Sequence, residues 1–277
     1  MEINLVKSLF DTNALKVSPE DKPFWYTSGK IGPLYVNTHF LYGGEKSAVE
    51  MLSFIDEAVK IPSSCAGDVL KKCGENYINS PIYKNLIDAM AQKIENEINL
   101  SEIAYISGGE RRDWFFSLII AEKLNKPHLT MFKNGRIFMG ENEAAQITGN
   151  VLHIADLITE ASSYVRAWIP FIQKIGAVIT HSLCVVDRLQ GGSELIKSNN
   201  IESLCMIEIN AALFDKAAEF GIVTESQADM LKNYILASDE TMKTFIKNNP
   251  QFLQNALASD EKTKERAKFC LEKGFYK

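Results

Sequence analysis

The sequence contains no apolar run close to the roughly 20 residues that a membrane-spanning helix requires. It has only four histidines, which are scattered, and nothing in it resembles the ligand spacing of a zinc site. Glu2 and Lys7 lie within an amphipathic pattern, which argues against a signal peptide. The cysteines are odd in number and unrelated in spacing, so we expect free thiols and a reducing, cytoplasmic setting: Cys65, Cys73, Cys184, Cys205 and Cys270.

The chain also lacks an excess of positive charge. Its 30 Lys and Arg residues stand against 35 Asp and Glu, giving a formal net charge of -5. A general nucleic-acid binder needs a basic surface, so we expect no nucleic-acid partner and no membrane partner. The length of 277 residues and the 46% hydrophobic content suit one large α/β domain, or a core with an appendage.

The first third of the chain predicts helices around a short aromatic stretch. Amphipathic helices are expected over 3–15, 45–59 and 83–98, with two short extended segments between Phe24 and Asn37. Residues 62–75 are polar and are expected to form a linker.

Strands and helices then alternate, which indicates a parallel sheet. Strands are expected over 103–106, 127–132, 151–154, 177–186 and 203–209, with helices over 114–124 and from about 164 to 175. Residues 133–149 contain three glycines and are expected to be a mobile loop or lid. After Asn210 there is no strand signal, and three or four short helices are expected. We therefore predict an α/β domain over 1–210, with an N-terminal segment over 1–36, and a helical extension over 211–277.

Four segments reach the carboxyl edge of this sheet, where parallel sheets bind their ligands. They are Ser107–Asp113 with Arg111 and Arg112, the 133–149 loop with Lys133 and Arg136, the turn from Asp156 to Ser163, and Val185–Gly192 with Arg188. Glycines, hydroxyls and a helix start in these segments favour anion binding. The alternatives are solvated loops, charge pairs with Glu110 or Asp113, and an ion pair of Arg188 with Asp187 or Glu194.

Together these motifs resemble one family. The order is TSGKIGPLY at 27–35, ISGG with Arg111, a loop with Lys133 and Arg136, VLHIADLIT followed by ASS, and VVDRLQGG at 185–192. This is similar to the orotate phosphoribosyltransferases, which have the type I phosphoribosyltransferase fold. The resemblance covers roughly residues 3–210 and implies a parallel sheet flanked by helices, with the N-terminal segment as a hood.

The resemblance implies an enzyme of pyrimidine nucleotide biosynthesis, a glycosyltransferase. Such enzymes transfer ribose 5-phosphate from phosphoribosyl diphosphate (PRPP) to orotate or a related base and release diphosphate, with Mg²⁺ on the diphosphate. No metal ligand is expected from the protein itself, and a homodimer is implied.

The resemblance also assigns roles by position. Asp156 would hold ribose hydroxyls, Thr159, Ser162 and Ser163 would bind the 5-phosphate, and Arg111 would lie near the diphosphate. Lys133 and Arg136 match catalytic cations near or on the lid. Arg188 matches the arginine that reads the orotate carboxylate, and Ser28, Gly29 and Lys30 lie in the segment that caps the base.

The sequence departs from the family pattern inside the phosphate turn. Ala155 replaces the first of two adjacent acids, Ala161 replaces a glycine, and Glu160 adds a negative charge. An alternative therefore stays open, in which the chain keeps the fold and a nucleotide-binding or regulatory role without catalysis.

Overall fold

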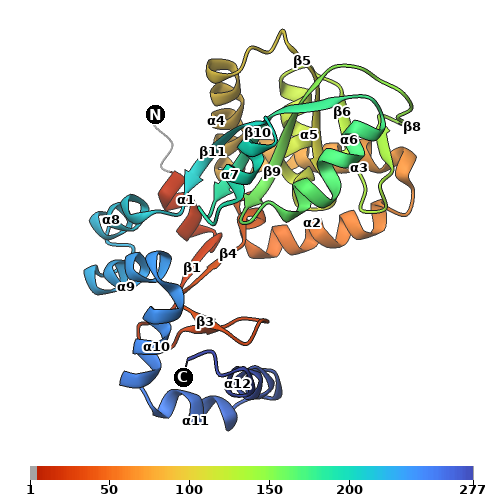
Figure 1. The fold of residues 1–277 in the computed structure, drawn as a ribbon. Coiled ribbons are helices and arrows are strands. Elements are labelled where there is room, and N and C mark those ends of the chain that lie inside the picture. Colours follow the sequence, from red (N-terminus) through yellow and green to blue (C-terminus); the bar gives the residue numbers. More distant parts are fainter. Residues whose placement is uncertain (1–4, 277) are drawn as a thin grey trace. The chain divides into compact units, whose positions relative to one another are not determined.

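The computed structural model describes residues 5–276, so Ile3 and the start of the helix expected over 3–15 lie outside the described residues. Contacts divide the chain into two compact units (Figure 1). The α/β unit comprises the chain up to Ala14 and Thr38–Ile209, and the helical unit comprises Leu15–Asn37 and the chain from Asn210 onward. Residues 15–37 thus group with the helical unit, whereas the sequence placed residues 1–36 with the α/β domain.

The α/β unit is built on one seven-stranded sheet in the order β11-β10-β9-β5-β6-β7-β8. The five strands from β11 to β6 pair in parallel, and β7 and β8 continue the sheet antiparallel. Their bounds are β5 (Ile103–Gly109), β6 (His128–Met131), β7 (Ile137–Met139), β8 (Asn142–Glu143), β9 (Asn150–Ile158), β10 (Val178–Asp187) and β11 (Glu202–Glu208).

Apolar runs in the central strands explain the parallel arrangement, because such strands are covered by helices on both faces. α5 (Trp114–Lys123) packs against β5, β6 and β9, and its residues Trp114–Ala121 are all buried. The π-helical turn η2 (Tyr164–Trp168) and α6 (Ile169–Lys174) contribute Tyr164, Trp168 and Ile172 to a core that includes Val151 and Cys184. α7 (Gly192–Ser198) packs beside β11.

Residues 62–75 are helical, so the expected linker is wrong. α3 (Pro62–Asn79) begins with proline at its first turn, where proline is well tolerated. Its buried stripe is Cys65, Ala66, Val69 and Cys73. These small or sulfur-containing residues follow helical spacing, but they give a weak hydropathy signal. The other helices before the sheet are α1 (Leu5–Asp11), η1 (Thr38–Tyr42), α2 (Glu45–Ala58) and α4 (Pro81–Glu97).

Two further expectations need correction. The stretch 133–149 is not structureless: β7 pairs with β6, and β8 pairs with β7, so much of it is a hairpin on the sheet edge. The central strand extends to Ile158 rather than ending at Ile154. Asp156 therefore lies inside the strand, near its carboxyl end.

The helical unit joins two small antiparallel pairs to five helices, one or two more than expected. β1 (Leu15–Val17) pairs with β4 (Leu34–Val36), and β2 (Phe24–Trp25) pairs with β3 (Ile31–Gly32). Thr224 and Gln227 form a capping box on the second of these helices, and Gly274 ends the last one in the left-handed conformation. The helices are α8 (Ala211–Glu219), α9 (Glu225–Leu236), α10 (Ser238–Asn248), α11 (Gln251–Leu257) and α12 (Glu261–Lys273).

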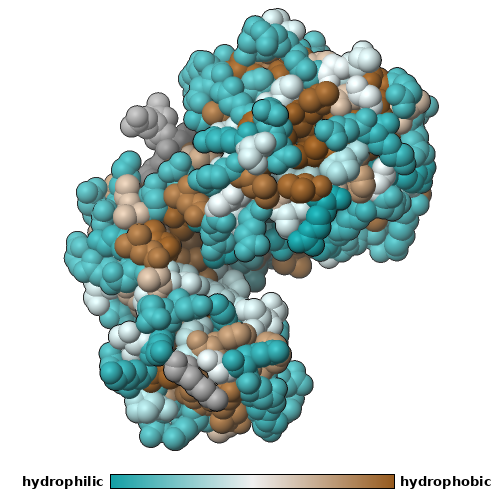
Figure 2. All heavy atoms as spheres, viewed as in Figure 1, coloured by the Kyte–Doolittle hydropathy of each residue, from teal (hydrophilic) through white to brown (hydrophobic). Residues whose placement is uncertain are grey.

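The visible surfaces of both units are largely hydrophilic, with scattered apolar areas (Figure 2). Three exposed apolar side chains, Val49, Ile61 and Ile78, lie on α2, between α2 and α3, and on α3. Within residues 5–276, no helix combines the length and apolar character needed to cross a membrane.

Candidate functional site

The order of the strands fixes where a ligand is expected. β5 and β9 are neighbours, but the chain leaves β5 toward β6 on one side and leaves β9 toward β10 on the other. A crevice opens at such a switch point, outside the carboxyl ends of the strands. The segments that follow β5 and β9 are Glu110–Asp113 and Thr159–Ser163.

A cavity of about 300 Å³ lies at this point. Six of the predicted site residues are on its wall, including Asp156 and the hydroxyl residues of the turn. The wall consists of Glu110, Arg111, Arg112, Asp113, Lys133, Ala155, Asp156, Leu157, Thr159, Ala161, Ser162, Ser163, Tyr164 and Trp168. A second hollow of about 290 Å³ shares Glu110, Lys133, Ser162, Ser163 and Trp168 with it.

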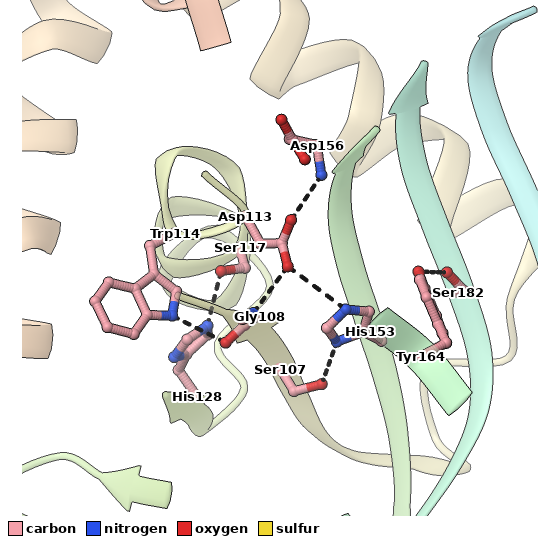
Figure 3. Close-up of polar contacts among 11 residues, drawn as sticks. Ser107, Gly108, Asp113, Trp114, Ser117, His128, His153, Asp156, Tyr164 and Ser182 are labelled. Carbon is pink, nitrogen blue, oxygen red and sulfur yellow. Dashed lines mark hydrogen bonds and ion pairs between the residues drawn. The ribbon is translucent and has the colours of Figure 1, made fainter. Parts of the chain in front are cut away.

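Two acidic residues that line this cavity, Asp113 and Asp156, are neighbours in the structure (Figure 3). Asp113 Oδ1 accepts the backbone N–H of Asp156 at 2.9 Å, and Asp113 Oδ2 accepts the backbone N–H of Gly109 at 2.9 Å. Asp156 Oδ2 is buried and has no hydrogen-bond partner within residues 5–276. A buried oxygen without a donor is costly, so this atom is placed to accept a hydrogen bond from a ligand.

Burial raises the pKa of both acids. The pKa of Asp156 rises to about 6 because of burial, opposed by the positive charge of Arg112. The pKa of Asp113 lies well above its usual value because of burial and the neighbouring Asp156 charge. Both shifts favour the protonated form, so the two carboxyls disfavour being ionised together.

A buried histidine lies behind the pair. His153 Nδ1 is 2.9 Å from Ser107 Oγ, and His153 Nε2 is 3.7 Å from Asp113 Oδ2. Burial lowers the pKa of His153 to about 3, so the ring is neutral near pH 7. Tyr164 and Trp168 contact the same ring, with centroid distances of 5.0 and 6.3 Å. The neutral ring of His153 therefore lies next to the two acids and is itself tightly packed.

The turn after β9 contributes Ala161 and the hydroxyl residues Thr159, Ser162 and Ser163 to the cavity wall. Ala161 has φ of 51°, so it adopts the left-handed conformation that its non-glycine side chain makes less favourable. The turn therefore forms without a glycine. The hydroxyls of Thr159, Ser162 and Ser163 make no hydrogen bond within the described chain, and η2 begins directly after them. Glu160 is exposed and is absent from the cavity wall, so its charge points away.

The two glycines of the SGG segment do not lie in the anion-binding loop that the sequence predicted. Gly108 and Gly109 lie within β5, not in a loop, and are buried. A Cβ on Gly108 would lie 2.1 Å from Ser117 Oγ, and a Cβ on Gly109 would lie 2.2 Å from Trp168 Cζ2. Close packing of α5 and η2 against the strand therefore requires both glycines.

Several predicted cations already have partners. Arg111 lines the cavity but forms an ion pair with Asp56 of α2. Lys133 Nζ lies 3.5 Å from Glu110 Oε1. Arg136 is not on the cavity wall: its guanidinium bonds Glu143 at 2.9 and 3.1 Å and lies over the Phe138 ring.

The predicted base-binding residues lie outside this cavity. Arg188 follows β10, has no ion pair within residues 5–276, and donates its backbone N–H to Ile158. The alternatives of an ion pair with Asp187 or Glu194 are therefore not observed there; Asp187 instead bonds Leu189 N and Ser193.

Ser28, Gly29 and Lys30 belong to the helical unit. Lys30 forms an ion pair with Asp239 at 2.8 Å, and the Cα of Gly29 is packed against Phe269. The helical unit also has its own cavity of about 1030 Å³, between the residues around Trp25 and helices α11 and α12, and none of the predicted site residues lines it.

Asp113 and His153 are the functional residues that the sequence did not identify. In the sequence, Asp113 is recognisable only as a charge partner for arginine, and His153 only as part of a strand. Asp113 bonds Asp156 from 43 positions earlier in the chain. No local pattern indicates this contact, because it depends on β5 and β9 being neighbours.

The fold and the site together define a class: an α/β protein with an acid, three hydroxyl residues and a helix start on one cavity at the switch point of a parallel sheet. No family model matches the chain. The orotate phosphoribosyltransferase of Sulfolobus acidocaldarius is 24% identical over 237 residues, which are 84% of this chain and 97% of that protein. That of Sinorhizobium medicae is 28% identical over 136 residues, 47% of this chain and 57% of that protein.

Solved structures agree on the fold. Orotate phosphoribosyltransferase from Aeropyrum pernix has a TM-score of 0.52 at 16% identity, covering 77% of this chain and 99% of that one. UMP synthase from Leishmania donovani has a TM-score of 0.56 at 16% identity, and the match spans 83% of this chain but 41% of that one. The chain therefore has the type I phosphoribosyltransferase fold and is a distant homologue of orotate phosphoribosyltransferases.

Proposed function

We propose that the protein is a phosphoribosyltransferase that moves ribose 5-phosphate from PRPP to orotate or a related base, in pyrimidine nucleotide biosynthesis. The observation that carries this proposal is the buried, unpartnered Asp156 Oδ2 on a cavity that is also lined by the hydroxyl residues Thr159, Ser162 and Ser163. A ribose 5-phosphate needs an acceptor for its hydroxyls at one end and an anion site at the other. The cavity offers both.

The roles follow from the positions of the groups. Asp156 accepts hydrogen bonds from the ribose hydroxyls, and Thr159, Ser162 and Ser163 bind the 5-phosphate together with N–H groups at the start of η2. Arg112, which is exposed on the cavity wall, and Lys133 face the side left for the diphosphate. The bond from ribose C1 to the diphosphate oxygen breaks with its electrons on diphosphate, and N1 of the base forms the new bond to C1 and loses its proton to diphosphate or solvent. The cations stabilise the charge that develops on the leaving group.

Mg²⁺ fits this scheme as part of the substrate. Within residues 5–276, no group of three or more His, Cys, Asp or Glu side chains is arranged to hold a metal ion. The donor set of the cavity, with two acids of which one keeps its proton, suits hydroxyls better than a divalent cation. The diphosphate oxygens of PRPP would bind the ion, and the ion would neutralise part of their negative charge.

Base binding is assigned to Arg188, and the role of the Ser28–Lys30 segment in capping the base is retained from the resemblance alone. Arg188 has a free guanidinium after the neighbouring strand β10, and a guanidinium can bind a planar carboxylate through two hydrogen bonds. Lys133 and Arg136 are retained as proposed lid cations, and a homodimer is proposed from the resemblance.

Arg188→Ala is expected to abolish measurable orotate binding while PRPP affinity changes less than threefold. Loss of paired hydrogen bonds to a carboxylate costs on the order of 2–5 kcal/mol. Isothermal titration calorimetry with each ligand separately would measure both effects. Lys197→Ala is the control, since Lys197 is an exposed cation of α7 that lines neither of the two hollows and should leave both affinities unchanged. Equal loss of both ligands in Arg188→Ala would show that Arg188 has a structural role.

The proposal is tested by incubating the protein with PRPP, Mg²⁺ and orotate and measuring diphosphate release. Continuous release that requires all three components supports it. Binding of PRPP without release would support the alternative, a nucleotide-binding or regulatory protein, which is favoured by Ala155 at the first acid position. Absence of binding would contradict both.

A further inference from the structure

The position that precedes Asp156 cannot supply a second acid to the site. It is occupied by Ala155, which is 3% exposed and belongs to the apolar core with Tyr164 and Trp168. An ionised side chain there would be buried among apolar groups at a high free-energy cost. The strand therefore contributes one acid only.

A carboxyl from a different element lies beside that single acid. Asp113 comes from the turn that starts α5, is 8% exposed, and lines the same cavity as Asp156. Its two oxygens accept the backbone N–H groups of Asp156 and Gly109, which belong to the adjacent strands β9 and β5. Asp113 thus clamps the two strand ends together at the cavity.

We propose that Asp113 supplies the second acid of this site and acts as a positioning residue: its neutral carboxyl donates a hydrogen bond to the Asp156 carboxylate and holds it for the ribose hydroxyls. This inference rests on the proposed function for the identity of the ligand. In this proposal a residue at the start of α5 supplies the second acid, which the resemblance places before Asp156 on β9.

The surroundings favour one proton on the pair. The titratable groups around the two acids are Arg112 before α5, His153 on β9, Tyr164 on η2 and Cys184 on β10, and the same cavity is lined by Glu110, Arg111 and Lys133. His153 is neutral near pH 7, and burial raises the pKa of Tyr164 and Cys184. Arg111 is paired with Asp56 and Lys133 with Glu110, which leaves Arg112 as the cation that acts on Asp156. One positive charge balances one carboxylate, so a second carboxylate would be uncompensated and the shared proton is retained.

The arrangement has a consequence for ligand binding. The Asp113 hydrogen bond favours the ionised form of Asp156 and therefore keeps the Asp156 pKa lower than burial alone would set it. Sugar binding should be strong above about pH 6, where Asp156 is ionised, and should weaken as the pH falls through that value. Removal of Asp113 should move this midpoint to higher pH.

Two measurements test the proposal. Carbon-13 NMR of the wild-type protein with labelled aspartate follows the protonation of both carboxyls directly. We expect one of them to keep its proton at pH 7. Ionisation of both below pH 5 would overturn the proposal, whether or not the protein binds a sugar phosphate.

The second measurement is calorimetry with ribose 5-phosphate between pH 5 and 8. Asp113→Ala is expected to weaken binding about tenfold at pH 7, as for loss of one hydrogen bond to a charged group, and to raise the pH midpoint. Asp113→Asn should restore part of the affinity, because its amide can donate to Asp156. Glu160→Gln, an exposed acid on the same turn, is the control and should behave as wild type.

A folded Asp113→Ala variant with wild-type affinity and midpoint would contradict the role of Asp113. Failure of the wild-type protein to bind ribose 5-phosphate or PRPP would instead contradict the proposed function. The NMR titration would still decide whether the two acids share a proton.

Discussion

Asp156→Asn is expected to lower kcat/KM for PRPP by about 100-fold or more. Each hydrogen bond to a charged group contributes roughly 1.5–3 kcal/mol, and Asp156 is proposed to accept the ribose hydroxyls with an oxygen that has no other partner in the described chain. Asparagine has nearly the same shape as aspartate, and the backbone N–H of residue 156 can still donate to Asp113. The substitution therefore tests the effect of the negative charge alone. Steady-state kinetics with varied PRPP at saturating orotate would measure the effect.

Stability should respond in the opposite direction. The pKa of Asp156 in the folded chain, about 6, lies above its usual 3.8, so ionisation at pH 7 is less favourable in the folded chain than in the unfolded chain. The neutral Asp156→Asn side chain avoids that cost, and its melting temperature at pH 7 should equal or exceed that of wild type. A variant within threefold of wild-type kcat/KM would show that Asp156 does not hold the substrate. Low activity with a lower melting temperature would indicate misfolding instead.

Gly109→Ala is expected to destabilise the protein by about 3 kcal/mol, in the upper range for overpacking of a core. The added Cβ would lie 2.2 and 2.5 Å from Trp168 Cζ2 and Cε2. The indole ring has little room to move, because it is 8% exposed and packs against His153 and Phe171. Urea denaturation followed by circular dichroism would measure the free energy of unfolding.

Gly67→Ala is the matched control for this substitution. Gly67 lies within α3, is exposed, and has nothing within 4 Å of the added Cβ. Alanine in a helix is favoured over glycine by roughly 0.5–1 kcal/mol, so this variant should be more stable than wild type. Equal stability of Gly109→Ala and wild type would mean that η2 is not packed on β5 as the structure has it.

Local patterns predicted those parts of the structure that depend on local sequence. The apolar runs at 151–154 and 177–186 indicated parallel strands, and both are strands of the central sheet. The small polar pair Ser162 and Ser163 indicated a helix start, and η2 begins at the next residue. Ala161, which stands where the resemblance has a glycine, nevertheless adopts a φ of 51°.

The remaining features depend on tertiary contacts. The sequence predicts a linker where α3 lies, because the buried stripe of this helix consists largely of cysteine and alanine. The sequence predicts a mobile loop over 133–149, because β7 and β8 are stabilised by pairing at the edge of the sheet and not by a local pattern. The link between Asp113 and Asp156 follows from the sheet order, which no local pattern encodes. Residues 15–37 pack with helices far along the chain, as the ion pair of Lys30 with Asp239, 209 positions away, shows.

Formation of a nucleotide from PRPP and orotate tests the central claim most directly. Wild-type protein with Mg²⁺, PRPP and orotate should release diphosphate and form, in equal amount, a product with the mass of orotate joined to ribose 5-phosphate. The same mixture with Asp156→Asn should show release reduced by about 100-fold. Folded wild-type protein that binds PRPP but forms no nucleotide with orotate or any other pyrimidine base would contradict the claim that this cavity carries out transfer.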